Sequence, residues 1–398
     1  VGDDVTVLDA SGKFVMPGID PHTHLAMDCM DFLSTQTVDD FFSGQAAALA
    51  GGTTMHIDFV IPVNGNLMAG FQAYKNKAKV SCMDYGFHMV IIKWDDVVSR
   101  DMEIMVKEHC INSFKFFMAY KGALMVSYEI DALEEVTKAR KSGFIEMFNI
   151  LQFCLLSIND TVVVLIYCLR ILVLVEETKG TKAIMNLLIL SYLSFDERRL
   201  RQESYKKHKH THTHKNKRTH ACKQNYTQSH THTNTTNEMT NTPQHVFPLY
   251  RNQCIEERMH LVWDTMVESG QISATDYVRL TGIECARIFN IYPRKGAILA
   301  GSDADIIILN PNSSFEISSS SHHSRIYTNI YEGWRGKGKV EVTIAGGRVV
   351  WENDELKVVP GSGKYIEMPP FSYLFNGIEK ADARHLSSLR APVKRCNS

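Results

Sequence analysis

The stretch from Phe14 to His24 reads Phe-Val-Met-Pro-Gly-Ile-Asp-Pro-His-Thr-His. Its first residues are apolar, and the sequence predicts a β-strand over 15–24 that ends on two histidines. Residues two apart on a strand project to the same face, so His22 and His24 present their imidazoles together. Neutral imidazole is a good ligand for Zn²⁺, and barrel enzymes place their active sites at the carboxyl ends of parallel strands. The stretch therefore indicates a metal site at the end of such a strand.

Helix and strand patterns alternate from this stretch as far as Gly143. Helices are expected over 39–50, 101–109 and 125–141, and strands over 53–61, 82–92 and 113–120. Strands that alternate with helices at this spacing predict βα units and a parallel sheet. His56 and His88 fall inside two of these strands, so we expect them to be core histidines rather than ligands.

The C-terminal third of the chain has a different pattern. Helices are expected over 256–269 and 273–289, the second with Ser273 as its N-cap. A strand is expected over 306–309, and Gly346-Gly347 separates two apolar stretches, 340–344 and 348–351, that read as a β-hairpin. This part of the chain predicts a small β domain rather than more barrel.

A second chemical signal is Lys115, which lies within the apolar stretch from Ser113 to Tyr120. A lysine in a buried strand is unfavourable unless it is neutralised or paired. The side chain of Lys115 can reach the end of the strand and form an ion pair with an acid there, which would be a purely structural role. Alternatively, its neutral amine can react with CO₂ to give an anionic carbamate that bridges two metal ions. The residues alone leave both interpretations open.

The middle of the chain, 144–254, differs in kind. Its first part, 144–175, is apolar, but charged residues interrupt it, so no uncharged run reaches the ~18–20 residues that span a bilayer. A basic stretch over 198–223 and a His- and Thr-rich tract over 208–241 follow, and such composition predicts disorder. The tract can bind metal, bind a polyanion, or be translated non-coding sequence. The His-Thr alternation favours the last, because a CA dinucleotide repeat encodes it; a genuine insert is the alternative.

The composition of the 398-residue chain is that of a globular protein, with 44% apolar and 22% charged residues. This excludes a wholly disordered, collagen-like or disulfide-scaffold chain. The net charge of −1 gives no argument for a nucleic-acid partner. Nine cysteines without a Cys-X-X-Cys pair indicate reduced thiols in a cytoplasmic compartment. The chain begins with Val1, which is consistent with a fragment and leaves a signal peptide unjudged.

Two regions of the chain resemble the dihydropyrimidinase family of cyclic amidohydrolases. The matching stretches are 16–20, 22–24, 47–55 and 112–121 in the first region, and 256–259, 289–296 and 301–305 in the second. The Gly-Thr-Thr run at 52–54 and the Tyr-Pro-Arg-Lys-Gly run at 292–296 are specific, which argues against chance. The stretch 144–254 resembles nothing in the family.

The resemblance implies an α/β fold: a (β/α)₈ barrel with a β-sandwich built from both chain ends. It implies two zinc ions bridged by a carbamylated lysine and a hydroxide. His22 and His24 match the first-strand ligands, Lys115 matches the bridging lysine, and Tyr120 matches a tyrosine that holds substrate. The implied reaction is hydrolysis of a small cyclic amide such as 5,6-dihydrouracil. A cytoplasmic homotetramer without nucleic-acid or membrane partners is also implied.

The resemblance also divides the chain. We expect N-terminal sandwich strands (1–17), the first half of the barrel (18–143), the non-matching segment (144–254), terminal barrel helices (255–300), the C-terminal sandwich (301–370) and a tail (371–398). The family takes two further histidines and a catalytic aspartate from later strands, and 144–254 offers no match for them. We therefore expect an incomplete barrel, half a metal site and an inactive chain.

Two alternatives to an enzyme remain. The collapsin response mediator proteins share this fold, lack catalysis and act as scaffolds, and their branch replaces the equivalent lysine and second histidine. Retention of His24 and Lys115 favours the enzyme lineage over that branch. A membrane-tethered variant that uses 144–175 is the second alternative.

Overall fold

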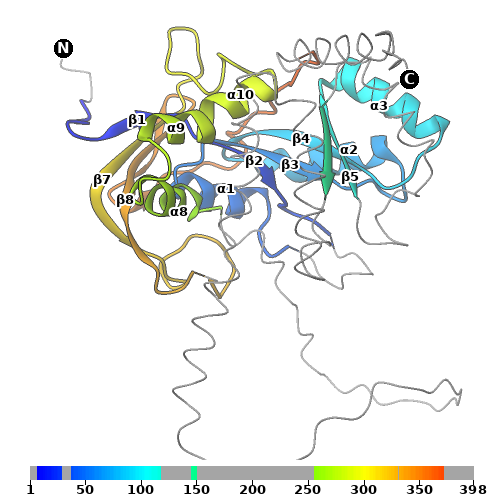
Figure 1. The fold of residues 1–398 in the computed structure, drawn as a ribbon. Helices are drawn as coiled ribbons and strands as arrows, with labels where there is room; N and C mark the ends of the chain where they lie inside the picture. The colour runs from blue at the N-terminus through cyan, green and yellow to red at the C-terminus, as the bar shows by residue number, and fades with distance from the viewer. Residues whose placement is uncertain (1–6, 29–36, 118–144, 150–254, 330, 372–398) are drawn as a thin grey trace, which may run out of the picture.

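The computed structural model describes residues 7–28, 37–117, 145–149, 255–329 and 331–371. These residues form two five-stranded sheets with helices packed against them (Figure 1). One sheet is parallel and has the order β2-β3-β4-β5-β6; the other is antiparallel and has the order β1-β7-β8-β9-β10. The architecture is α/β: a parallel sheet with its helices, as expected for part of a (β/α)₈ barrel, beside an antiparallel sheet, as expected for the sandwich.

In the parallel sheet, neighbouring strands are also consecutive along the chain. Its strands are β2 (Ile19–Thr23), β3 (Met55–Val60), β4 (Asp84–Ile91), β5 (Ser113–Phe117) and β6 (Ile145–Asn149). The helices between them are α1 (Phe41–Ala50), α2 (Leu67–Lys77), which the single 3₁₀ turn η1 (Ala78–Val80) extends, and α3 (Asp96–His109). Each helix follows a strand, as the alternation in the sequence predicts.

Local chemistry sets where these helices begin. Asp40 accepts a hydrogen bond from the Ser43 N–H at 2.8 Å, and the Ser43 hydroxyl accepts one from the Asp40 N–H, so α1 begins at Phe41 with a capping box. Asp95 caps α3 by accepting from Val97 N and Val98 N, which starts that helix five residues before the expected Asp101. Both helices are therefore fixed by acidic N-caps.

The expected single strand over 15–24 is wrong in one respect. The structure divides it into β1 (Phe14–Met16), in the antiparallel sheet, and β2, in the parallel sheet. The chain passes between the sheets at Pro17 and Gly18. Pro17 has no N–H to give to a ladder, and a Cβ on Gly18 would lie 2.3 Å from the carbonyl oxygen of Gly52. Pro17 thus interrupts the strand, and the close approach of the backbone to Gly52 admits only glycine at position 18.

The antiparallel sheet joins the two ends of the described chain. Its strands are β1, β7 (Ile306–Glu316), β8 (Arg335–Ala345), β9 (Arg348–Glu352) and β10 (Glu355–Leu356). Phe14 lies opposite Leu309, so β1 pairs with a strand almost three hundred residues later (Figure 1). Gly346 and Gly347 both have positive φ, at 55° and 77°, and form the expected hairpin turn between β8 and β9.

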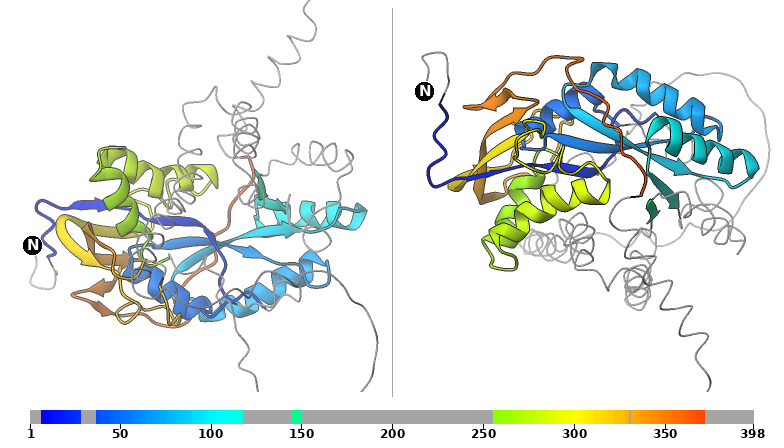
Figure 2. Two further views of the ribbon diagram at one scale, coloured as in Figure 1. Left: turned by 60° about the horizontal axis from the view of Figure 1, so that its bottom comes forward. Right: turned by 90° about the horizontal axis from the view of Figure 1, so that it is seen from above.

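Two helical stretches lie alongside the two sheets and pack against both (Figure 2). They are α8 (Arg258–Val262) with the π-helical η4 (Trp263–Val267), and α9 (Ala274–Val278) with the π-helical η5 (Arg279–Ile283) and α10 (Glu284–Ile288). Ser273 caps the second, as expected, by accepting from Asp276 N. Apolar residues of α10 pack on Ile19 and Met55 of the parallel sheet, whereas Trp263 packs on the antiparallel one. The helices thus join the two sheets.

Several expectations fall outside the described residues. The helix over 125–141, Tyr120 and the His-Thr tract lie there, as does almost all of 144–254; β6 is the part of that segment that the structure describes. Within the described ranges, no helix is long and apolar enough to cross a membrane.

Candidate active site

The two histidines of the opening motif lie at the carboxyl end of β2. His22 belongs to the strand and is partly buried, and His24 follows it directly and is buried. Their ring centroids are 5.3 Å apart, with the planes at 69°. The period of the strand therefore brings both imidazoles to one face, as the sequence predicts.

The ring of Phe59 in β3 lies at the centre of this face. Its centroid is 4.6 Å from that of His22 and 5.0 Å from that of His24. Phe59 is opposite His88 in the β3–β4 register, and Val90 is opposite Lys115 in the β4–β5 register. Because side chains of neighbouring parallel strands in register share a face, four strands deliver side chains to one place.

Lys115 lies in the middle of β5 and is only 2% exposed. Its Nζ atom is 4.1 Å from the centroid of the Phe59 ring, which places the amine over the aromatic face. The expectation that this lysine lies in a buried strand is confirmed. Phe59 contacts both histidines and the amine, so His22, His24 and Lys115 surround a single ring.

His88 and His56 are core residues, as expected. The Nε2 of His88 faces the carbonyl oxygen of Pro21 at 2.8 Å, and its Nδ1 faces the Ser113 hydroxyl. A carbonyl only accepts, so Nε2 carries the proton and Nδ1 accepts from Ser113. Burial lowers the pKa of each imidazole to about 3, which leaves both neutral at pH 7. Their ring nitrogens form hydrogen bonds within the core.

Asp58 is a site residue that our sequence reasoning missed. It is fully buried in β3, and its Oδ2 accepts from the Thr23 hydroxyl and from Leu25 N, both at 2.8 Å. Burial raises the pKa of this carboxyl to about 8. The sequence did offer a signal for Asp58: an acid within the apolar strand Met55–Val60 must have hydrogen-bond partners, because an unpaired acid is unfavourable there.

A second acid, Asp20, lies at the start of the same motif. It accepts from His22 N at 3.0 Å, and the Nε of Arg258 lies 3.9 Å from its Oδ2. Burial raises the pKa of Asp20, and the charge of Arg258 opposes that shift. The turn before the histidines is therefore held by its own acid and by a helix from the C-terminal third.

The donor atoms fit part of a metal centre. A catalytic zinc site takes three protein ligands and a structural one takes four. Among the described residues, no group of three or more His, Cys, Asp or Glu side chains is placed to hold a metal ion. These residues therefore supply an imidazole pair and a buried amine, whereas Tyr120 lies outside the described ranges.

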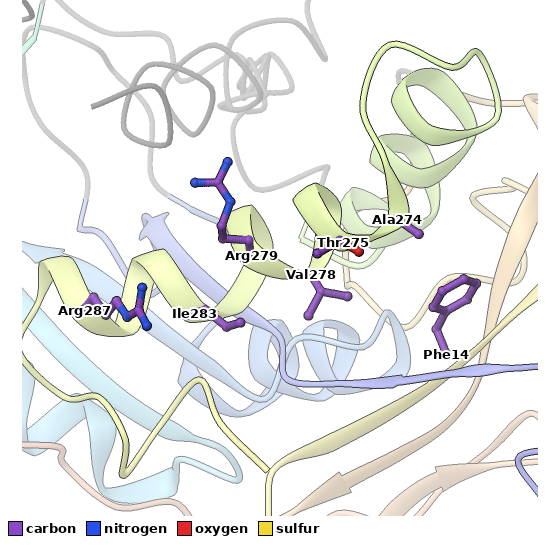
Figure 3. A pocket seen from close by; sticks show the side chains of 7 residues that line it. All are labelled: Phe14, Ala274, Thr275, Val278, Arg279, Ile283 and Arg287. Carbon is purple, nitrogen blue, oxygen red and sulfur yellow. The ribbon is translucent and has the colours of Figure 1, made fainter. Parts of the chain in front are cut away.

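A pocket of about 370 Å³ lies elsewhere, between β1 and the helices of the C-terminal third (Figure 3). Phe14, Val278 and Ile283 give it apolar walls, and Arg279 and Arg287 lie at its edge. Both guanidinium groups pair with Glu284. The pocket includes none of the residues around Phe59, so it is separate from the candidate site.

Comparison with known proteins places the chain in a family. It is 54% identical to the dihydropyrimidinase of Arabidopsis thaliana over 449 aligned residues, which cover 99% of this chain and 84% of the relative. The chain belongs to the dihydropyrimidinase family. A family model described as "Amidohydrolase family" matches residues 239–350. The aligned length exceeds the 398 residues of this family member, so the Arabidopsis protein has internal stretches that this chain lacks.

Two further comparisons define the relation. The crystal structure of the dihydropyrimidinase from Brevibacillus agri superposes with a TM-score of 0.64 at 23% identity, covering 93% of this chain and 92% of that one, which shows the shared fold. Dihydropyrimidinase-related protein 5 of Mus musculus is 27% identical, over 92% of this chain and 74% of the relative. The chain is thus twice as similar to the Arabidopsis dihydropyrimidinase as to the mouse related protein.

Proposed function

We propose that this chain is a hydrolase of ring amides, of the 5,6-dihydropyrimidine class, with His22, His24 and Lys115 as ligands for zinc. One observation carries the proposal: these three side chains surround Phe59, the two histidines at the carboxyl end of β2 and the lysine from the middle of β5. Active sites of parallel barrels lie at that end. Membership of the dihydropyrimidinase family supports the same substrate class.

The chemistry of each residue suits this role. Zinc, when bound, lowers the pKa of a water molecule and polarises a carbonyl group. The imidazoles of His22 and His24 bind it in their neutral form. The buried amine of Lys115 adds to CO₂, forming one N–C bond and releasing one proton, and the two oxygens of the resulting carbamate share one negative charge. Tyr120 would hold the substrate through its phenol.

The same proposal includes a partial site. The described residues assemble no third histidine or acid beside His22 and His24. The Arabidopsis relative has internal stretches that this chain lacks, which agrees with the loss of later barrel strands. We therefore propose that the ancestral function used two zinc ions and that this chain retains a weakened form of that activity. We also propose that the chain is cytoplasmic and that the family assembles as a homotetramer.

Zinc content and ring opening of 5,6-dihydrouracil test the proposal together. The full chain is purified with zinc and bicarbonate beside the Arabidopsis relative, and as His22→Ala, His24→Ala and Lys115→Ala variants. We expect bound zinc that each variant reduces, and a ring-opening rate at least about 100-fold below that of the relative. The matched control is His260→Ala, which removes a partly buried histidine of α8 that contacts Phe315 rather than Phe59.

Zinc content that none of the three substitutions changes would contradict the proposal. It would favour a non-catalytic scaffold of the collapsin response mediator type, because that branch needs no metal. Activity equal to that of the relative would contradict only the proposal that the activity is weakened, and would leave the zinc ligands and the substrate class in place.

A further inference from the structure

A chain of buried hydrogen bonds runs behind the two histidines, on the face of the sheet that α1 covers. It links Gln45 of α1, His56 of β3, Thr23 of β2 and Asp58 of β3, all of them buried. Side chains alternate along a strand, so Thr23 projects away from the face that carries His22 and His24. This hydrogen-bond chain therefore lies on the opposite face of the sheet from the metal-binding histidines and supports them from behind.

The direction of donation along this hydrogen-bond chain follows from the orientation of Gln45. The amide oxygen of Gln45 accepts from the backbone N–H groups of Cys82 at 2.8 Å and Met83 at 3.0 Å. Those two bonds fix the orientation of the amide, because a backbone N–H can only donate. The amide nitrogen of Gln45 therefore faces the Nε2 of His56, 2.8 Å away, and donates to it.

The remaining protons are then determined. His56 is neutral, so an Nε2 that accepts leaves the proton on Nδ1, which donates to the Thr23 hydroxyl oxygen at 2.6 Å. Thr23 has one hydroxyl proton and gives it to Asp58 Oδ2 at 2.8 Å. Asp58 Oδ2 also accepts from Leu25 N. Every donor in the chain points toward Asp58, which is its terminal acceptor.

We propose that Asp58 is a positioning residue that fixes the backbone on both sides of His24 and thereby holds the imidazole pair in a metal-binding arrangement. Its oxygen accepts from residue 23 and from residue 25, so the segment that carries His24 is attached at both neighbours. Groups behind metal ligands tune affinity by fixing ligand orientation. This inference rests on the proposed zinc site and adds a residue that touches no ligand directly.

The test uses the full chain with three substitutions. Asp58→Leu keeps the branched shape and removes the acceptor, and Thr23→Val removes only the hydroxyl. Asp58→Asn keeps one oxygen that can accept from both Thr23 and Leu25. The matched control is Asp305→Leu, because Asp305 is a buried acid in β-sandwich sequence that also accepts from a backbone N–H, that of Gly346.

Two readouts separate positioning from general destabilisation. The first is backbone hydrogen exchange of the peptide over 19–27 without metal; the second is zinc affinity by competition with a chromogenic chelator. We expect Asp58→Leu to speed exchange in this peptide about tenfold and to weaken zinc binding about 10–100-fold. Thr23→Val has a smaller effect in the same direction, Asp58→Asn stays within about threefold of the parent, and Asp305→Leu changes neither.

Unchanged exchange over 19–27 in Asp58→Leu would overturn the inference, whatever the metal result, because the segment would then be held by other contacts. Equal effects of Asp58→Leu and Asp305→Leu would also overturn it, since the role would be general stability. A parent chain that binds no zinc through His22 and His24 would instead defeat the proposed function, and the exchange experiment would still decide whether Asp58 positions the segment.

Discussion

The amine of Lys115 in β5 lies over the ring of Phe59 in β3, with Nζ 4.1 Å from the ring centroid. The two strands are not neighbours, since β4 lies between them, so this contact reaches across the inner face of the sheet. Phe59 is 1% exposed and also contacts His22, His24 and His88. One aromatic ring thus sets the spacing of every candidate ligand that the structure describes.

Replacing that ring should loosen the site as well as the core. We expect Phe59→Leu to lower the free energy of unfolding by about 1–2 kcal/mol, because it removes buried contacts, and to lower zinc content. Phe87→Leu is the control: Phe87 is equally buried but belongs to the core between β4 and the helices. Urea unfolding and metal analysis of both variants check this. A Phe59→Leu protein with parental zinc content would show that the ring is only core.

A buried ionic cluster should dominate the stability of the contact between the sheets. Lys295 is 1% exposed and pairs with Asp84 at the start of β4, with Asp303, and with Asp305 just before β7. Lys295→Met would leave these carboxylates without their cation, so we expect a loss of about 3–5 kcal/mol in urea unfolding.

The exposed pair of Lys339 and Asp354 provides the comparison for that variant. Because solvent screens this pair, Lys339→Met should change the free energy of unfolding by less than about 0.5 kcal/mol. Equal effects of the two lysine substitutions would contradict the dominance of the buried cluster.

Glu257 predicts a pH dependence of stability. Burial, and secondly the charge of Glu256, raise the pKa of this carboxyl from 4.5 to about 8. The folded state then holds the proton more tightly than the unfolded state, so the contribution to stability is complete below about pH 4.5 and is lost as the pH rises through about 8. Asn329 donates to Glu257 at 2.6 Å, a bond that a glutamine can keep.

Glu257→Gln should therefore remove this dependence. We expect its free energy of unfolding to rise relative to the parent between about pH 5 and about pH 9. Urea unfolding at several pH values measures the difference, with Glu316→Gln, at an exposed pair, as control. Parallel pH profiles of the parent and Glu257→Gln would refute the assignment.

The N-cap at Ser273 offers a local test. Its hydroxyl accepts from Asp276 N at 3.1 Å and begins the helical stretch that ends at Ile288. Ser273→Ala should lower the free energy of unfolding by about 1 kcal/mol, and Ser273→Asp should retain most of it. Thermal unfolding of both variants measures these effects. An unchanged stability of Ser273→Ala would mean that the packing of Tyr277, and not the cap, stabilises the start of this helix.

The features that the sequence predicted are those with local causes. Ser273, Gly346 and Gly347 act within a few residues, so their helix cap and hairpin turn were legible from the chain. The period of two along a strand placed His22 and His24 on one face for the same reason. The burial of Lys115 followed from the apolar residues around it.

The features that were missed depend on distant partners. Asp58 finds its donors more than thirty residues earlier, and Lys295 meets Asp84 more than two hundred residues away. The passage from β1 to β2 was read as one strand because nothing local reveals how closely Gly18 approaches Gly52. Tertiary proximity decides such sites, and a pattern along one chain does not contain it.

The pairing of β1 with β7 also determines how much the middle of the chain adds to the entropic cost of folding. Once Phe14 lies opposite Leu309, everything between them is a closed loop, held at both ends by the sandwich. The entropy of closing a loop grows only with the logarithm of its length, so the residues from 150 to 254 add about 0.4 kcal/mol to that closure. The strand pairing is therefore insensitive to the length of this segment, although it depends on the helices of the loop that pack on the sheet, such as the one that carries Trp263. A change confined to 150–254 can leave the pairing of β1 with β7 intact.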